Sequence, residues 1–343
     1  MSLSWIKSRN RQHNGSNSWL FLRKLSPSKL TTALQQNLQQ LSKHRQDRLA
    51  IILELNNLYA VHTVGDGKHR HVDWSIIHPL STPLFNGVPG QADEAALDKF
   101  FAEVSSKIAG DYVSIQLSLP DPVVMTGFYQ IDTIPAKPQQ ARELAGWRLL
   151  RQYHVHDQTL YCDCQTVGTK TQKQTLLAVA MDDNWLSLLQ RTLQKNNLLV
   201  PVMEPAIHYK FNQLTESEKA SAGVLVSLTK EYWTILIWDE AGDPRYIRSR
   251  RHQQIGTEVV LGFSEIAAEI IRTILVYSHE EANTEIGRVF ISARQRERVM
   301  LGEYLQHKME QQVERPEIEQ ETISTDVILE DLPAVCHAVM VSR

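Results

Sequence analysis

The sequence has few cysteines, a small net charge and no long apolar run without charges. It contains three cysteines among its 343 residues, and so low and odd a number suits a reducing compartment rather than an oxidising one. The net charge is only −3, which disfavours a protein whose whole surface binds nucleic acid. We therefore expect no nucleic-acid partner.

The most apolar long segment, VVLGFSEIAAEIIRTILVYS at residues 259–278, still carries Glu265, Glu269 and Arg272. Charges near the middle of a segment are costly in a bilayer. Their spacing of four and three residues places them on one face of a helix, so an amphipathic helix is expected instead. The N-terminus shows no apolar run typical of a signal peptide. We therefore expect a cytoplasmic protein that meets the inner membrane only through a partner.

The composition is that of a folded chain. Hydrophobic residues make up 42% and charged residues 22%, a mixture typical of globular proteins. A length of 343 residues is enough for two or three subdomains with cores of their own. Residues 1–18 are polar and basic, which predicts a loose tail, with lipid contact of the basic residues as the alternative. Pro27 and the periodic leucines after it predict a short helix within 27–46.

Two parts of the chain show the same order of predicted elements. RLAIILEL and LYAVHTV predict a hairpin that turns at Asn56–Asn57, and GVLVSLT and YWTILIWDEAG predict another that turns at Lys230–Glu231. A third strand, a helix and a further strand follow in each part, which indicates a repeat of topology rather than of sequence. The predicted organisation is a flexible tail and short helix at 1–46, the first half of subdomain I at 47–120, an α+β insert at 121–183, the completion of subdomain I at 184–220, and subdomain II at 221–343.

Three helix boundaries are predicted from local signals. A helix that starts near residue 93 is expected to end at Gly110, because glycine is favoured just after a helix. Asp183 is expected to be the N-cap of the helix in DNWLSLLQRTLQKNN. A long helix is expected over residues 255–280.

Three longer stretches carry a family resemblance. They are QIDTIP with the charged helix QQARELAGWRLLRQY, LLAVAMDDNWLSLLQRTLQKNNLLVPVMEPAIHYKFN, and TILIWDEAGDPRYIR. With the repeated hairpins, they resemble the actin-like ATPases, and more narrowly the PilM family of type IV pilus assembly with its MshI relatives and the cytoplasmic part of the type II secretion protein GspL. The resemblance implies an α/β, actin-like (FtsA/PilM-type) fold, which is a duplicated ribonuclease-H-like fold, with a small α+β insert subdomain.

The positions that would bind phosphate depart from that family's pattern. In the family, short glycine-bearing loops offer free backbone N–H groups to the phosphates of ATP. Here every such position is altered, so we expect no enzyme activity, no catalytic residues and no cofactor. Residual ATP binding through the charges of Lys230, Arg250 and Arg251 is the alternative. The altered positions are Glu54, Asn56 and Asn57 in the first loop, Ser227 and Thr229 in the second, Arg250 and Arg251 after the third strand, and Ala293 in the adenosine loop.

The resemblance also implies a partner. In the family, a groove between the first subdomain and the insert receives the N-terminal cytoplasmic tail of a PilN-like one-pass inner-membrane protein. Trp147 and Arg151 are the predicted neighbourhood of this contact, although Trp147 with Leu150 is also expected to face the core of the insert. The expected function is a scaffold in MSHA-like type IV pilus assembly, with a motor ATPase and self-association as further expected contacts. A GspL-like secretion scaffold, an active divergent ATPase and a regulator that binds a small ligand between the halves remain as alternatives.

Two other patterns are weaker. His154, His156, Cys162 and Cys164 lie within eleven positions and alternate as zinc ligands on strands could. Their spacing is unusual for zinc, so ordinary insert residues and no metal are expected. The basic stretch RYIRSRRH is expected to be solvated, with an acidic segment or anionic headgroups as the alternative contact.

Overall fold

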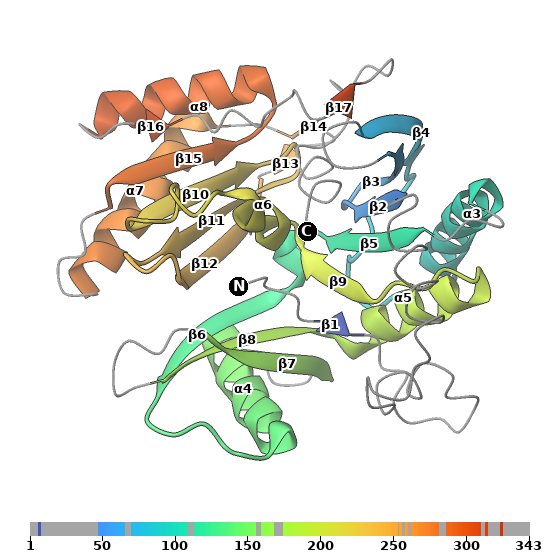
Figure 1. Ribbon diagram of the computed structural model, residues 1–343, viewed down its shortest axis with the longest axis horizontal. Helices are drawn as coiled ribbons and strands as arrows, with labels where there is room; N and C mark the ends of the chain where they lie inside the picture. The colour runs from blue at the N-terminus through green and yellow to red at the C-terminus, as the bar shows by residue number, and fades with distance from the viewer. Residues whose placement is uncertain are drawn as a thin grey trace, which may run out of the picture.

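The computed structural model describes residues 6–7, 47–65, 70–108, 113–155, 159–167, 174–252, 254–255, 258–259, 262–280, 286–309, 313–314 and 323–324. Figure 1 shows two large sheets side by side, with a small sheet and its helix below them. The helix expected within 27–46 and the final segment PAVCHAVMVS lie outside the described residues. The helix expected to end at Gly110 ends earlier, at Lys107, with Ile108 as its C-cap residue.

The first large sheet has its hairpin at the centre. Its strands are, in order across the sheet, β1 (Ile6–Lys7), β9 (Val202–Pro205), β5 (Ser114–Leu119), β2 (Arg48–Leu53), β3 (Asn57–Val64), β4 (Arg70–Pro79) and β17 (Ile323–Ser324). Strands β2, β3 and β4 pair antiparallel, whereas β5 is parallel to β2 and β9 is parallel to β5. Both central strands are buried along most of their length because their apolar runs do not alternate with polar residues.

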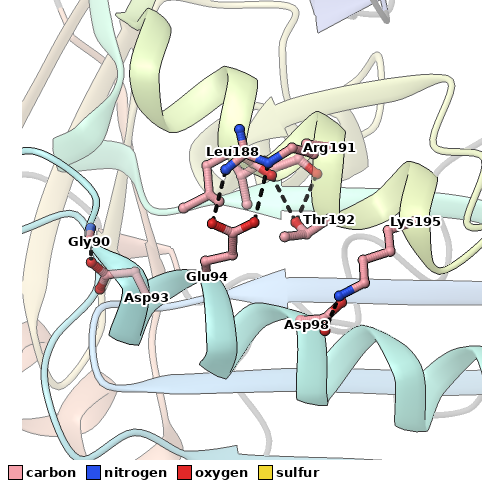
Figure 2. A network of polar contacts seen from close by, with 9 residues as sticks. Gly90, Asp93, Glu94, Asp98, Leu188, Arg191, Thr192 and Lys195 are labelled. Carbon is pink, nitrogen blue, oxygen red and sulfur yellow. Dashed lines mark hydrogen bonds and ion pairs between the residues drawn. The ribbon is translucent and has the colours of Figure 1, made fainter.

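Two helices, α3 (Gln91–Lys107) and α5 (Asp183–Lys195), lie side by side next to this sheet (Figure 1). Figure 2 shows the polar contacts between them: Arg191 pairs with Glu94 at 3.1 Å, and Lys195 Nζ donates to Asp98 Oδ2 at 2.7 Å. These pairs are partly exposed to solvent, so they contribute little. The buried apolar faces of the two helices supply most of the stabilisation.

The second large sheet repeats the first. Its strands are, in order, β12 (Pro244–Arg251), β11 (Tyr232–Trp238), β10 (Gly223–Leu228), β15 (Arg288–Ser292) and β16 (Val313–Glu314). Helix α7 (Phe263–Glu280) precedes β15 and helix α8 (Gln295–Lys308) follows it. Strand β15 is parallel to β10, and β16 is parallel to β15, as β5 and β9 are in the first sheet. The predicted repeat of topology is therefore confirmed, and it extends one helix and one strand beyond the prediction.

The insert is a separate layer. Strands β6 (Met125–Ile131), β8 (Gln174–Asp182) and β7 (Leu160–Val167) form an antiparallel sheet in that order, and helix α4 (Pro138–Tyr153) packs on it. The predicted charged helix of the insert is confirmed as α4, and the sheet gives the insert its expected α+β character. The residue boundaries predicted between the subdomains stay a prediction, and β17 shows that the late part of the chain returns to the first sheet.

One helix and one aromatic cluster join the two large sheets. Helix α6 (Ala206–Gln213) lies between them in Figure 1. The ring of its Phe211 lies 5.5 Å from the ring of Trp238, which in turn lies 5.8 Å from Phe290. The Trp238 indole N–H donates to the carbonyl of Ser221 at 2.8 Å, so the polar group of this fully buried side chain is satisfied.

Three local predictions were wrong. The helix expected from residue 255 begins at Phe263, because the short strands β13 (Gln254–Ile255) and β14 (Glu258–Val259) pair with each other first. The N-cap of α5 is Asp182 rather than Asp183, since its carboxylate accepts from the N–H groups of Asn184 and Trp185. Within the predicted loose tail, Ile6–Lys7 pair with β9 as a strand.

The apolar segment at residues 259–278 lies mostly in α7. This helix buries Ile266, Ile270 and Ile274 against the second sheet and exposes Arg272, so the predicted amphipathic helix is confirmed. Among the residues that the structure describes, no helix is both long and apolar enough to span a membrane.

Candidate functional site

The first hairpin turn joins β2 to β3 and is the position of the expected first phosphate loop. The Glu54 N–H donates to the carbonyl of Asn57 at 2.9 Å, so the two central residues of the turn are Leu55 and Asn56. Asn57 is already the first residue of β3. The prediction of a turn centred on Asn56–Asn57 was therefore wrong by one residue.

The N–H groups of this turn are bound by a side chain from the second sheet. The Leu55 N–H donates to Glu231 Oε2 at 2.7 Å, and the Asn56 N–H donates to Glu231 Oε1 at 2.8 Å. One carboxylate therefore accepts two adjacent backbone donors, each through a different oxygen. A residue about half the chain away therefore engages both donors.

The carbonyls of the same turn are also bound. The Leu84 N–H donates to the carbonyl of Leu55 at 2.7 Å, and the Leu80 N–H donates to the carbonyl of Asn56 at 2.9 Å. The segment after β4 thus fixes the turn from the side opposite its N–H groups. A turn held in this way cannot easily rearrange to wrap a ligand.

The second hairpin turn lies between β10 and β11, with Lys230 and Glu231 at its centre, as predicted. The Thr229 hydroxyl accepts from the N–H groups of Glu231 at 3.1 Å and Tyr232 at 3.0 Å. It also donates to the carbonyl of Tyr232 at 3.0 Å. Thr229 stands where the family has glycine, and its side chain binds N–H groups that a glycine would leave open.

Below the second turn lies a buried cation. The Nζ atom of Lys210 in α6 donates to the Ser227 hydroxyl at 2.6 Å, and both residues are buried. Ser227 stands where the family has an acid that orients water or metal. Here the site contains a lysine ammonium beside a neutral hydroxyl, so its charge is opposite to that of the family's carboxylate.

Two buried carboxyl groups surround this lysine. Burial and, to a lesser extent, the nearby Glu231 raise the pKa of Glu54 to about 7, while the charge of Lys210 opposes the rise. Burial likewise raises the pKa of Asp121 to about 6, opposed by the N–H of Ile207 and by Lys210. The junction of the two turns thus contains two buried acids whose raised pKa values are opposed by the charge of the buried Lys210.

The remaining predicted loop positions are Arg250, Arg251 and Ala293. Arg250 forms an ion pair with Glu269 of α7 at 3.3 Å, and Arg251 donates to the carbonyl of Phe85 at 3.2 Å. Ala293 is buried at the end of β15, just before Arg294, the N-cap residue of α8. The structure therefore brings Glu54, Asn56, Ser227 and Thr229 to one junction, while the side chains of the two arginines bind outside it.

A second candidate region is the outer face of α4. Trp147 is 51% exposed, and the guanidinium groups of Arg151 and Arg148 lie 5.3 and 5.6 Å from its ring centre. The prediction that Trp147 faces the core of the insert was wrong, because α4 buries Ala141, Ala145 and Leu149 instead. An exposed tryptophan between two arginines is a surface suited to protein contacts; its predicted role in partner binding stays a prediction.

The cysteines of the insert lie on β7 with free thiols. Burial raises the pKa of the Cys162 thiol to about 12 and also raises the pKa of Cys164, so both favour the protonated form, which is a poor ligand for zinc. His154 ends α4 in a left-handed conformation, and His156 lies outside the described residues. Within the described ranges, no group of three or more histidine, cysteine or acidic side chains is arranged to hold a metal ion.

Sequence reasoning missed the roles of two residues at the junction. Glu231 was expected only as a turn residue, and Lys210 was not singled out. An acid in an exposed turn and a lysine on a short helix carry no local signal of burial. Only the approach of the two sheets shows that they bind the opposite half.

No family model matches the sequence, and no curated protein matches it. Solved structures do show likenesses. A chain of the PilM–PilN type IV pilus biogenesis complex has a TM-score of 0.55 and 14% identity, over 85% of this chain and 96% of that one. A Bacteroides thetaiotaomicron protein of unknown function with an actin-like ATPase fold has a TM-score of 0.49 and 12% identity, over 80% of this chain and 92% of that one.

A third likeness is the cytoplasmic domain of EpsL, an inner-membrane component of the type II secretion system of Vibrio cholerae. It has a TM-score of 0.45 and 13% identity, over 86% of this chain and 93% of that one. At 14% identity, the likeness to the chain from the PilM–PilN complex shows a shared fold. With the duplicated sheet topology, it confirms the expected actin-like fold.

Proposed function

We propose that this protein is a cytoplasmic scaffold of type IV pilus assembly, of the MSHA-like kind, that binds the N-terminal tail of a PilN-like inner-membrane protein and does not turn over nucleotide. The fold shared with a chain of the PilM–PilN complex supports the partner class. It meets the membrane through this partner, and a motor ATPase and further copies of the chain are additional proposed contacts.

The observation that carries the non-catalytic part of the proposal is the contact of Glu231 with the first turn. Phosphate binding in this kind of fold needs free N–H groups from both turns. In the structure, the N–H groups of Leu55 and Asn56 bind Glu231, and those of Glu231 and Tyr232 bind Thr229. An acid beside these donors also repels phosphate.

We expect ATP and ADP with magnesium to show no binding heat and no thermal shift, because the donors are engaged and Glu231 is anionic. Calorimetry on the purified chain at millimolar nucleotide measures this directly. A micromolar affinity that falls on substitution of Lys230 would support the divergent ATPase instead and would reject this part of the proposal.

We expect Trp147→Ala and Arg151→Ala to weaken binding of a PilN-like tail peptide by roughly 30-fold each, because exposed tryptophan and arginine are the residues that most often dominate interfaces. Fluorescence anisotropy of the labelled peptide gives the affinities. The Arg151 guanidinium lies against the Trp147 ring, so the two effects should not add.

Arg142→Ala is the matched control, because Arg142 lies on the same helix but pairs with Asp163 at 3.0 Å. It removes the same charge without touching Trp147. Equal weakening by Arg142→Ala and Arg151→Ala, with no weakening by Trp147→Ala, would indicate non-specific charge attraction. Unchanged binding in the Trp147 and Arg151 variants would place the partner elsewhere.

A further inference from the structure

The side chain of Glu231 crosses from one half of the molecule to the other. Its backbone belongs to the β10–β11 turn of the second sheet, while both of its carboxylate oxygens accept from the β2–β3 turn of the first sheet. The two contacts, at 2.7 and 2.8 Å, join residues 176 and 175 positions apart. Glu231 is only 8% exposed, so water competes little for its oxygens.

The geometry of this contact is that of an anion in a backbone cradle. Consecutive N–H groups in a tight turn form a concave donor site that suits carboxylate and phosphate alike. Hydrogen bonds from neutral donors to an ionised carboxylate are shorter and stronger than those between neutral groups. A carboxylate supplied by the chain itself therefore satisfies the donors that would otherwise need a ligand or water.

Glu231 and the aromatic cluster lie at opposite ends of β11. Glu231 directly precedes β11, and Trp238 ends it. Six residue steps separate Tyr232 from Trp238, which is about 20 Å along an extended strand. At the far end Trp238 packs against Phe211 and Phe290. The halves are thus joined by an apolar cluster at one end of β11 and, at the other end, by the Glu231 carboxylate and by Arg251, which donates to the carbonyl of Phe85 at 3.2 Å.

The local backbone orients Glu231 for this contact. Its carbonyl accepts from the His252 N–H at 2.9 Å, and its own N–H donates to the Thr229 hydroxyl. The His252 ring also contacts the carbonyl of Thr229 at 2.9 Å. The turn therefore presents the carboxylate in one direction, toward the first sheet.

We propose that Glu231 is a built-in anionic ligand of the first turn, and that it holds the two turns together so that the halves stay closed with no nucleotide bound. Loss of the carboxylate opens the junction at the turns while the apolar cluster at Trp238 remains packed. This inference goes beyond the proposed scaffold function, and its test needs neither a partner nor a nucleotide.

The test is residue-resolved hydrogen exchange by NMR on the full chain and on Glu231→Gln. The glutamine has the same shape, but its single carbonyl oxygen can accept from only one of the two N–H groups, and its NH₂ group faces the other donor. We expect the N–H group that faces the NH₂ group to exchange about 100-fold faster in the variant. The other N–H group keeps a weaker bond to a neutral acceptor, so its exchange should also speed up, by a smaller factor. The N–H groups within β10 and β15 should keep their protection.

Glu231→Asp is the second variant, because it keeps the charge but withdraws the carboxylate by one methylene; it should also speed exchange at both positions. Glu240→Gln, at the exposed turn between β11 and β12, is the matched control and should change neither. Unchanged exchange at Leu55 and Asn56 in both Glu231 variants would overturn the proposal. Equal loss of protection across the core strands would also overturn it, because Glu231 would then support global stability rather than local closure.

Discussion

Lys210→Met is expected to lower the free energy of unfolding by about 3–5 kcal/mol, because it removes the cation from a buried ionic network and leaves the acids behind. The Lys210 charge opposes the raised pKa of both Glu54 and Asp121, and its ammonium donates to Ser227. Methionine fills a similar volume, so the loss reports the charge rather than a cavity. Urea unfolding followed by circular dichroism measures the change.

The control for this prediction is Lys195→Met. Lys195 pairs with Asp98 at 2.7 Å on the surface, with its side chain 66% exposed, and exposed pairs contribute less than about 1 kcal/mol. A double variant that also carries Glu54→Gln should recover part of the loss, since one of the uncompensated acids is then neutral. If Lys210→Met is as stable as the parent chain, the buried network does not need its cation and the account of the junction is wrong.

Glu54→Gln is expected to gain stability relative to the parent chain as the pH rises from 5 to 8. Burial and the neighbouring Glu231 raise the pKa of Glu54 from 4.5 to about 7 in the folded protein. Between these values the folded chain holds a proton that the unfolded chain has released, so the parent loses stability as the pH rises through this window. Above pH 7 the penalty is complete and amounts to at most about 3 kcal/mol. The glutamine cannot ionise, so the variant does not lose stability in this way.

Unfolding free energies at several pH values, compared between the two chains, isolate this contribution from all other titrating groups. Glu103→Gln, an exposed position on α3, supplies the baseline. Glu204→Gln should show a similar gain that continues to higher pH, because burial raises the pKa of Glu204 to about 8. A constant difference between the Glu54→Gln and parent chains from pH 5 to 8 would show that Glu54 is ionised in the folded state throughout.

These expectations share one physical basis. At the junction of the two turns, side chains of the chain itself bind the backbone N–H groups of both turns. Glu231 occupies two N–H groups of the first turn, Thr229 occupies two of the second, and Lys210 places a cation beside Ser227. We propose that this network stabilises contact between the halves and competes with phosphate for the same donors.

The sequence by itself determined the order of strands and helices in both halves. Apolar runs such as RLAIILEL and YWTILIW, the turn residues between strands, and the periodic apolar residues of α3, α5 and α7 are local signals, and they predicted these elements correctly. Boundaries were less certain where two neighbouring residues could serve, as with Asp182 and Asp183 at the start of α5. The resemblance also identified Glu54, Asn56, Ser227 and Thr229 as altered loop positions, but the hydrogen bonds of Glu231 and Thr229 to the backbone of the two turns were not visible in the sequence.

Only the tertiary structure decided which side chains are buried at the site and which are exposed. Glutamate and lysine usually lie at the protein surface, yet Glu231 and Lys210 are buried. Their burial depends on which residues of the other half of the chain lie opposite them. Tryptophan is a large apolar residue and would be expected in a core. The buried face of α4 instead consists of Ala141, Ala145 and Leu149, and Trp147 is exposed to solvent. Local periodicity sets the path of the backbone, whereas the partner of a charge is set by contacts between segments far apart in the chain, such as Leu55 and Glu231 at a separation of 176 residues.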